Sequence, residues 1–123
     1  MCYHCNVMLD INYYPEGISG PVKDFLDSLA KERPEAFARL AVDLEVLGAE
    51  GLRSRQITIR PLGDKLWELK RLYSGVQYRI FFGVHQGNVW LLHSVEKKSA
   101  KTPKNDLVLA KRRFKEVLTN EKL

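Results

Sequence analysis

Residues 65–103 read KLWELKRLYSGVQYRIFFGVHQGNVWLLHSVEKKSAKTP, and this stretch decides the fold. Three runs rich in β-branched, aromatic and other apolar residues follow one another, each ended by a turn sequence. The runs are Leu66–Lys70, Val76–Val84 and Val89–Val95, and the turns are Tyr73-Ser74-Gly75 and Gly87-Asn88. Because short turns join antiparallel neighbours, the stretch predicts an antiparallel meander.

The segments around the meander predict two further strands and three helices. Residues 56–60 alternate between polar and apolar side chains, as do residues 7–14, so each predicts a strand. Pro21 and Pro34 each stand at the first position of a helix whose apolar residues recur at helical spacing. Gly48 and Gly51 end the second of these helices. Thr102-Pro103 begins a last helix, with Leu107, Ala110, Phe114, Val117 and Leu118 at its buried positions.

Together these elements predict an α+β fold: a small antiparallel sheet with an N-terminal helical hairpin and a C-terminal helix. The N-terminal strand joins the meander, and the helices cover one face of the sheet. A length of 123 residues with 45% hydrophobic and 28% charged residues is typical of one globular domain spanning 1–123. We expect residues 1–6 to be flexible.

Charge is distributed unevenly along the chain. Residues 1–50 hold four basic and nine acidic residues, a net −5, whereas residues 51–123 hold sixteen and six, a net +10. Within residues 97–115, eight Lys or Arg stand against a single acid, Asp106. Such a density indicates a polyphosphate target, although a solvated basic face explains the charge equally well.

The two cysteines do not predict a metal site. Cys2 and Cys5 flank His4, but a structural zinc needs four ligands, and His85 and His93 each stand alone. The sequence has no apolar run approaching ~20 residues, and we expect no signal peptide, so we expect a cytoplasmic protein that binds no membrane and no metal.

Several motifs in sequence order resemble the phage-derived host-inhibition branch of the RelE/HigB toxin superfamily. They cover roughly residues 9 to 118, and their order and spacing carry the resemblance. The motifs are Tyr13-Tyr14, Pro21–Leu26, Leu66–Lys70, Tyr78–Phe82, Leu91–His93, Lys97–Pro103 and Ala110.

The resemblance implies the toxin of a type II toxin–antitoxin module. Such toxins are most often ribosome-dependent endoribonucleases that cut translated mRNA and need no cofactor. It also implies a cognate antitoxin, usually of the helix-turn-helix type, and implies the ribosome and mRNA as further partners.

Metal-free RNA cleavage needs a base for the 2′-OH, cations around the phosphate and an acid for the leaving 5′-oxygen. A lysine serves as the base only where neighbouring cations lower its pKa, and the run at residues 97–101 gathers lysines closely. Carried over by motif, the candidate catalytic residues are Arg79, Lys70, Lys97, Lys98 and His93. The candidate RNA-binding residues are Arg71, Tyr73, Lys101, Lys104, Lys111 and Arg112. Glu96 could orient a lysine or act as base, and the general acid stays unassigned.

Each candidate also has a structural interpretation. Arg79 could form a salt bridge with Glu68 across neighbouring strands, and His93 could be a satisfied core histidine. Trp67 and Trp90 fit a core or sheet-face position better than a base-stacking platform. The cations of the last helix, including Arg113, could contact ribosomal RNA or solvent.

Two other functions remain open. A ParE-like toxin of the same fold would poison DNA gyrase and cut no RNA, and a non-toxic nucleic-acid-binding module would carry the same charge. Substituting Lys70, Arg79 and Lys97 by alanine distinguishes the nuclease from the gyrase poison, because only the nuclease depends on them for cleavage.

Overall fold

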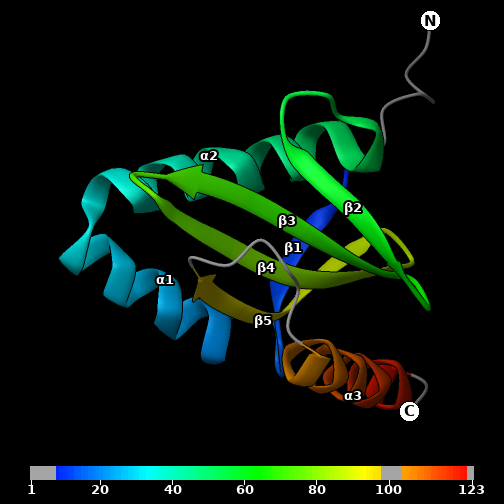
Figure 1. The fold of residues 1–123 in the computed structure, drawn as a ribbon. Coiled ribbons are helices and arrows are strands. Elements are labelled where there is room, and N and C mark those ends of the chain that lie inside the picture. Colours follow the sequence, from blue (N-terminus) through cyan, green and yellow to red (C-terminus); the bar gives the residue numbers. More distant parts are fainter. Residues whose placement is uncertain (1–7, 98–103, 122–123) are drawn as a thin grey trace, which may run out of the picture.

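The computed structural model describes residues 8–97 and 104–121. Its five strands form one sheet with the order β1-β5-β4-β3-β2 (Figure 1). In chain order the elements are β1 (Asp10–Tyr13), α1 (Pro21–Glu32), α2 (Pro34–Glu50), a single 3₁₀ turn (Gly51–Arg53), β2 (Thr58–Gly63), β3 (Leu66–Tyr73), β4 (Val76–His85), β5 (Asn88–Lys97) and α3 (Lys104–Glu121). The predicted α+β class, with a helical hairpin and a C-terminal helix, is confirmed.

The meander from β2 to β5 is antiparallel throughout, as predicted. β1 differs in two respects. It is shorter than the predicted strand at residues 7–14, and it pairs parallel to β5, with Ile11 opposite Val89. A parallel pair needs a long connection, which the helices and the meander supply. The predicted flexible residues 1–6 lie outside the described part of the chain.

Helices α1 and α2 cover one face of the sheet. Both begin with proline, and their apolar stripes pack on the β4 side chains Tyr78, Ile80 and Phe82. Gly20 precedes α1 with φ 146°, and a Cβ there would lie 1.8 Å from the Tyr14 carbonyl oxygen. Only glycine fits this approach, so Gly20 fixes where α1 begins.

Helix α3 covers the opposite face, so the expectation that the helices share one face is wrong for α3. The alternate side chains Leu66, Phe81 and Leu92 form a second core with the α3 residues Ala110, Phe114 and Val117. Because side chains alternate along a strand, a sheet with two apolar faces needs a cover on each. A Cβ on Gly83 would lie 2.5 Å from the Phe114 ring, so this glycine lets α3 approach the sheet closely.

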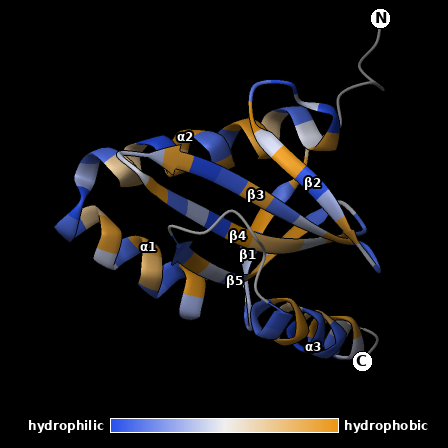
Figure 2. Ribbon diagram, in the orientation of Figure 1, coloured by the Kyte–Doolittle hydropathy of each residue, from blue (hydrophilic) through white to orange (hydrophobic). Residues whose placement is uncertain are grey.

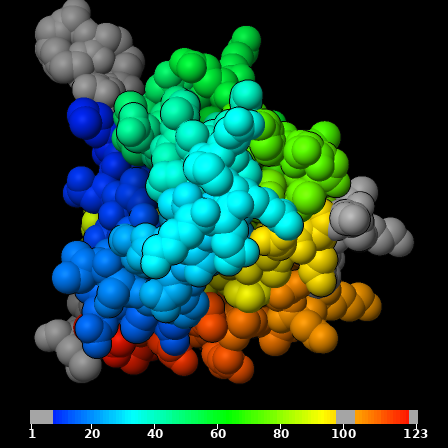
Figure 3. All heavy atoms as spheres, turned by 90° about the vertical axis from the view of Figure 1, so that its left-hand side faces the viewer, coloured from blue at the N-terminus to red at the C-terminus, as the bar shows by residue number. Residues whose placement is uncertain are grey.

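The colouring of the structure agrees with this layering. Hydrophobic and hydrophilic segments alternate along α1 and α3, as in amphipathic helices (Figure 2). Figure 3 shows the α1–α2 turn lying against the strands, and one cavity there is lined by Arg33–Ala36 and by Tyr73, Ser74, Val76 and Tyr78. Among the described helices, α3 alone lies on its face, and it contacts only β4 and β5 extensively. The remainder of that face carries the charged residues considered next.

Candidate functional site

Polar and charged side chains gather on the α3 side of the sheet, in rows fixed by the strand register. Side chains two residues apart share a face, so partners across β2, β3, β4 and β5 line up. The first row is Arg60, Glu68, Phe81, His93; the second is Thr58, Lys70, Arg79, Val95; the third is Leu72, Gln77, Lys97. We call these three rows the basic sheet face.

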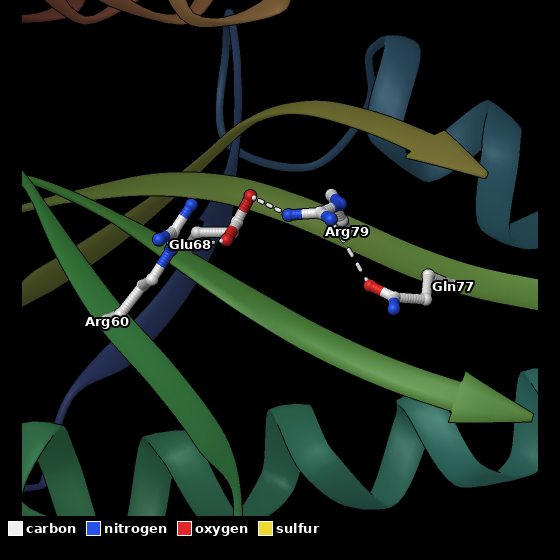
Figure 4. A network of polar contacts seen from close by, with 4 residues as sticks. All are labelled: Arg60, Glu68, Gln77 and Arg79. Atoms are coloured by element: carbon white, nitrogen blue, oxygen red, sulfur yellow. Dashed lines mark hydrogen bonds and ion pairs between the residues drawn. The ribbon is translucent and has the colours of Figure 1, made fainter. Parts of the chain in front are cut away.

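A buried ion pair lies at its centre (Figure 4). Glu68 and Arg79 both have 0% exposed side chains, and Arg79 Nη1 donates to Glu68 Oε2 at 2.8 Å. Arg60 Nε donates to the other carboxylate oxygen at 2.9 Å, and Arg79 Nη2 donates to Gln77 Oε1 at 3.2 Å. One carboxylate therefore holds two guanidinium groups from strands on either side of it.

Burial makes the pairing of these charges necessary. A buried charge costs several kcal/mol unless an opposite charge and hydrogen bonds accompany it. Glu68 supplies both to Arg79. The Arg79–Glu68 salt bridge across neighbouring strands is thus confirmed, whereas Arg60 and Gln77 were missed. The alternation of residues 56–60 could have indicated Arg60. Ile57 and Ile59 point toward the core, so Arg60 lies on the opposite face of the sheet.

The other cations of the basic sheet face reach solvent to different degrees. Lys70 is half-buried and lies opposite Arg79, and Lys97 is exposed and lies opposite Gln77. Leu72 is 64% exposed beside Gln77, so an apolar contact is available at this end. The candidates Lys98 and Lys101 lie outside the described residues.

Arg71 and Tyr73, although next to Lys70 in sequence, point to the opposite face. Arg71 donates to both carboxylate oxygens of Asp43 on α2, at 2.8 and 2.6 Å. That hydrogen-bonded pair raises the pKa of Arg71 above its ordinary value. Tyr73 donates to Glu35, and this hydrogen bond raises the Tyr73 pKa. The structure therefore does not bring these two residues together with Lys70.

His93 contacts α3 instead of the ion pair. Its Nε2 lies 2.6 Å from Asp106 Oδ1, and its ring stacks on Phe81 with centroids 5.9 Å apart. The side chain is 17% exposed. These contacts agree with the interpretation of His93 as a core histidine whose hydrogen bonds are satisfied. An imidazole that a carboxylate orients can nevertheless also transfer protons.

Glu96 and the two tryptophans serve the structure. Arg33 Nη1 lies 3.1 Å from Glu96 Oε2 and also donates to the Tyr78 hydroxyl at 3.0 Å, which raises the Arg33 pKa. Glu96 thus faces the helical hairpin, away from the basic sheet face. Trp67 and Trp90 are partly buried and pack on the two cores, as the structural interpretation holds.

The α3 cations form a separate group. Lys104 and Arg112 are exposed, and Lys111 Nζ lies 3.4 Å from Asp64 Oδ2 in the β2–β3 turn. Lys111 and Arg112 line a groove between α3 and this turn, at the start of β3, whereas Lys70 lies four residues further along the strand. They therefore lie apart from the ion pair.

No metal-binding cluster is found among residues 8–97 and 104–121, where no three His, Cys, Asp or Glu side chains converge. Cys2 and Cys5 lie outside these ranges. Within the described helices, none combines the length and apolar character needed to cross a bilayer.

Fold and site define a class: a small α+β protein whose sheet presents arginine and lysine around a buried ion pair, an arrangement suited to a polyanionic ligand. The chain belongs to the family described as phage-derived protein Gp49-like (DUF891), which matches residues 24–115. This family is toxin–antitoxin-related and RelE/HigB-like. Comparison with curated proteins and with solved structures finds no significant match.

Proposed function

We propose that this protein is the toxin of a type II toxin–antitoxin module and a member of the RelE/HigB superfamily. It acts in the cytoplasm as a ribosome-dependent endoribonuclease that cuts translated mRNA. The observation that carries the proposal is the basic sheet face, whose three rows hold four cations, Arg60, Lys70, Arg79 and Lys97, and one acid, Glu68. Membership of a toxin–antitoxin-related family supports the same reading.

The reaction is the attack of a ribose 2′-oxygen on the adjacent phosphate. A 2′-O–P bond forms, the P–O5′ bond breaks, a base takes the 2′-OH proton and an acid protonates the 5′-oxygen. In the proposal Lys97 contacts the phosphate and neutralises the charge that grows on it. No metal or other cofactor takes part.

Arg79 is the fixed cation of the site. Its guanidinium cannot lose its proton, and Glu68 and Gln77 hold it in one orientation. Because its side chain is 0% exposed, direct contact with the scissile phosphate requires the surface above it to open on binding RNA. Glu68 is a positioning residue, since it acts through Arg79 and Arg60.

We assign the proton-transfer groups by their positions relative to Arg79 in the sheet. Lys70 is the candidate base, because it lies opposite Arg79 in the sheet and is partly exposed. His93, oriented by Asp106, is the candidate acid, and it lies in the row next to Val95 and Arg79. An antitoxin silences the toxin between episodes of activity, and the ribosome presents the mRNA.

A gyrase-poisoning toxin of the same fold is the second candidate function. One observation favours it: the complete burial of Arg79 and Glu68, since a buried ion pair can serve the fold alone. In that case the exposed lysines contribute to protein contacts and not to cleavage.

Mapping of mRNA 5′ ends shortly after induction distinguishes the two candidates. Wild-type protein should produce new cuts in translated frames, and Lys70→Ala and Lys97→Ala should reduce them by about 10²-fold or more. Lys31→Ala, on exposed α1 surface, is the matched control and should cut like wild type. Growth arrest without new cuts would refute the nuclease and favour gyrase. Expression of the wild type without growth arrest would refute both toxins.

A further inference from the structure

A groove with an apolar floor and a cationic rim runs along α3. Its volume is ≈ 640 Å³, and it lies between α3 and the β2–β3 turn. The floor comprises Leu66, Val108, Phe114 and Leu118, and the rim comprises Lys65, Lys111, Arg112 and Lys115 with Asp64. Four cations against one acid leave the rim at a net +3.

We infer that this groove is the docking site for an acidic amphipathic helix of the antitoxin. The inference rests on the proposed function for the existence of an antitoxin, and goes beyond it in naming the surface and the chemistry of the occupant. That occupant carries apolar residues at helical spacing, flanked by aspartate and glutamate.

The shape of the groove suits a helix. Its α3 wall follows one side of the helix from Val108 to Leu118, which spans about 15 Å at 1.5 Å per residue. That length matches roughly three turns of a partner helix. Helices that dock in apolar grooves use a stripe of apolar side chains. Such a stripe would bury apolar area on Val108, which is 63% exposed, and on the partly exposed Leu118, whereas Leu66 and Phe114 are already buried.

The composition favours a protein over RNA. Val108 is 63% exposed, an apolar surface that a phosphate backbone gains nothing by covering. Phe114 is the aromatic residue of the lining, but it is 3% exposed beneath its neighbours, so no ring is presented for base stacking. The cations bracket this apolar surface, an arrangement complementary to acidic residues on either side of an apolar stripe.

The groove lies apart from the proposed catalytic face. Leu66, in its floor, and Lys70 are four positions apart on β3, which is about 13 Å. Mutations in the groove can therefore weaken the docking of a partner helix without altering Lys70 or Arg79. Docking and cleavage are separable functions in this arrangement.

The test measures binding of the purified toxin to the protein encoded by the adjacent gene, by isothermal titration calorimetry. Val108→Asp places a charge in the apolar floor, and Lys115→Glu reverses a rim cation. Each should weaken binding on the order of tenfold or more. The matched controls are Val42→Asp, at a valine 56% exposed on α2, and Lys31→Glu on α1; both should bind like wild type.

Toxicity in cells separates the inference from the proposed function. The groove variants should arrest growth like wild type, which also shows that they fold, and co-expressed antitoxin should no longer rescue them. Rescue equal to that of wild type would overturn the groove as the docking site while leaving the proposed function intact. Loss of mRNA cuts with unchanged antitoxin binding would reassign the groove to RNA. A wild-type toxin that does not bind the adjacent gene product would overturn both the docking site and the antitoxin assignment.

Discussion

Substituting Glu68 by glutamine tests the buried ion pair at the centre of the proposed site. The amide keeps the shape and one acceptor oxygen but removes the charge that balances Arg79. Both side chains are 0% exposed, with Arg79 Nη1 and Glu68 Oε2 2.8 Å apart. Removing one partner of such a pair leaves an uncompensated buried charge, which costs about 3–5 kcal/mol.

The ion pair between Glu68 and Arg60 adds little to this loss of stability. The Arg60 side chain is 50% exposed, so solvent screening limits its ion pair to roughly 0–1 kcal/mol. Because glutamine retains one acceptor, we place the total loss near the lower end, at about 3 kcal/mol. For a domain of this size that corresponds to a fall in Tm on the order of 10 °C.

Urea denaturation followed by circular dichroism, with linear extrapolation to water, measures the loss. Glu96→Gln is the matched control, because its partner Arg33 is 51% exposed and the pair should contribute less than about 1 kcal/mol. A Glu68→Gln protein as stable as this control would refute the reasoning. The double variant Glu68→Met/Arg79→Met should be more stable than Glu68→Gln, since neither charge remains buried.

Three further predictions concern the contacts that hold the helices on the sheet. Asp43→Asn should lower the free energy of unfolding by about 2 kcal/mol in urea denaturation, because it weakens the bidentate bond from Arg71; a loss under about 0.5 kcal/mol would contradict this. Gly83→Ala should lower the Tm, costing about 1–3 kcal/mol, because the new Cβ meets the Phe114 ring; an unchanged Tm would show that α3 shifts freely. Tyr73 should titrate above its ordinary pKa, because its hydrogen bond to an α2 carboxylate favours the neutral phenol. The contribution of this hydrogen bond to the stability of the fold is therefore present below about pH 10 and is lost as the pH rises through the raised pKa of Tyr73. Tyr73→Phe should remove a late step from the titration of tyrosine absorbance at alkaline pH.

Local patterns in the sequence predicted most of the elements. Pro21 and Pro34 marked the starts of both hairpin helices. The turn between β4 and β5 was predicted at Gly87-Asn88 and lies one residue earlier, at Gln86-Gly87, because Asn88 pairs with His85. These signals are local, because a proline or a two-residue turn constrains only its neighbours. The parallel pairing of β1 was not predicted, since strand direction depends on the path of the whole connection.

The candidate site was predictable in part. A short turn joins β3 to β4, so a salt bridge between Glu68 and Arg79 across the two neighbouring strands could be predicted from the sequence. The sequence could not show that Arg71 and Tyr73 bind α2 residues, because a partner twenty-eight or more positions away leaves no local signal. Nor could it show that Asp106 reaches His93.

By itself, then, the sequence determined an α+β domain with an antiparallel meander, a basic second half and a family resemblance. The domain class and the basic second half follow from periodicity, turn residues and composition, whereas the family resemblance rests on the order and spacing of the quoted motifs. Only the tertiary structure decided that α3 covers the face opposite the hairpin and that Arg79 is buried against Glu68. Burial is a property of what packs above a side chain, and for Arg79 that depends on the arrangement of the whole fold.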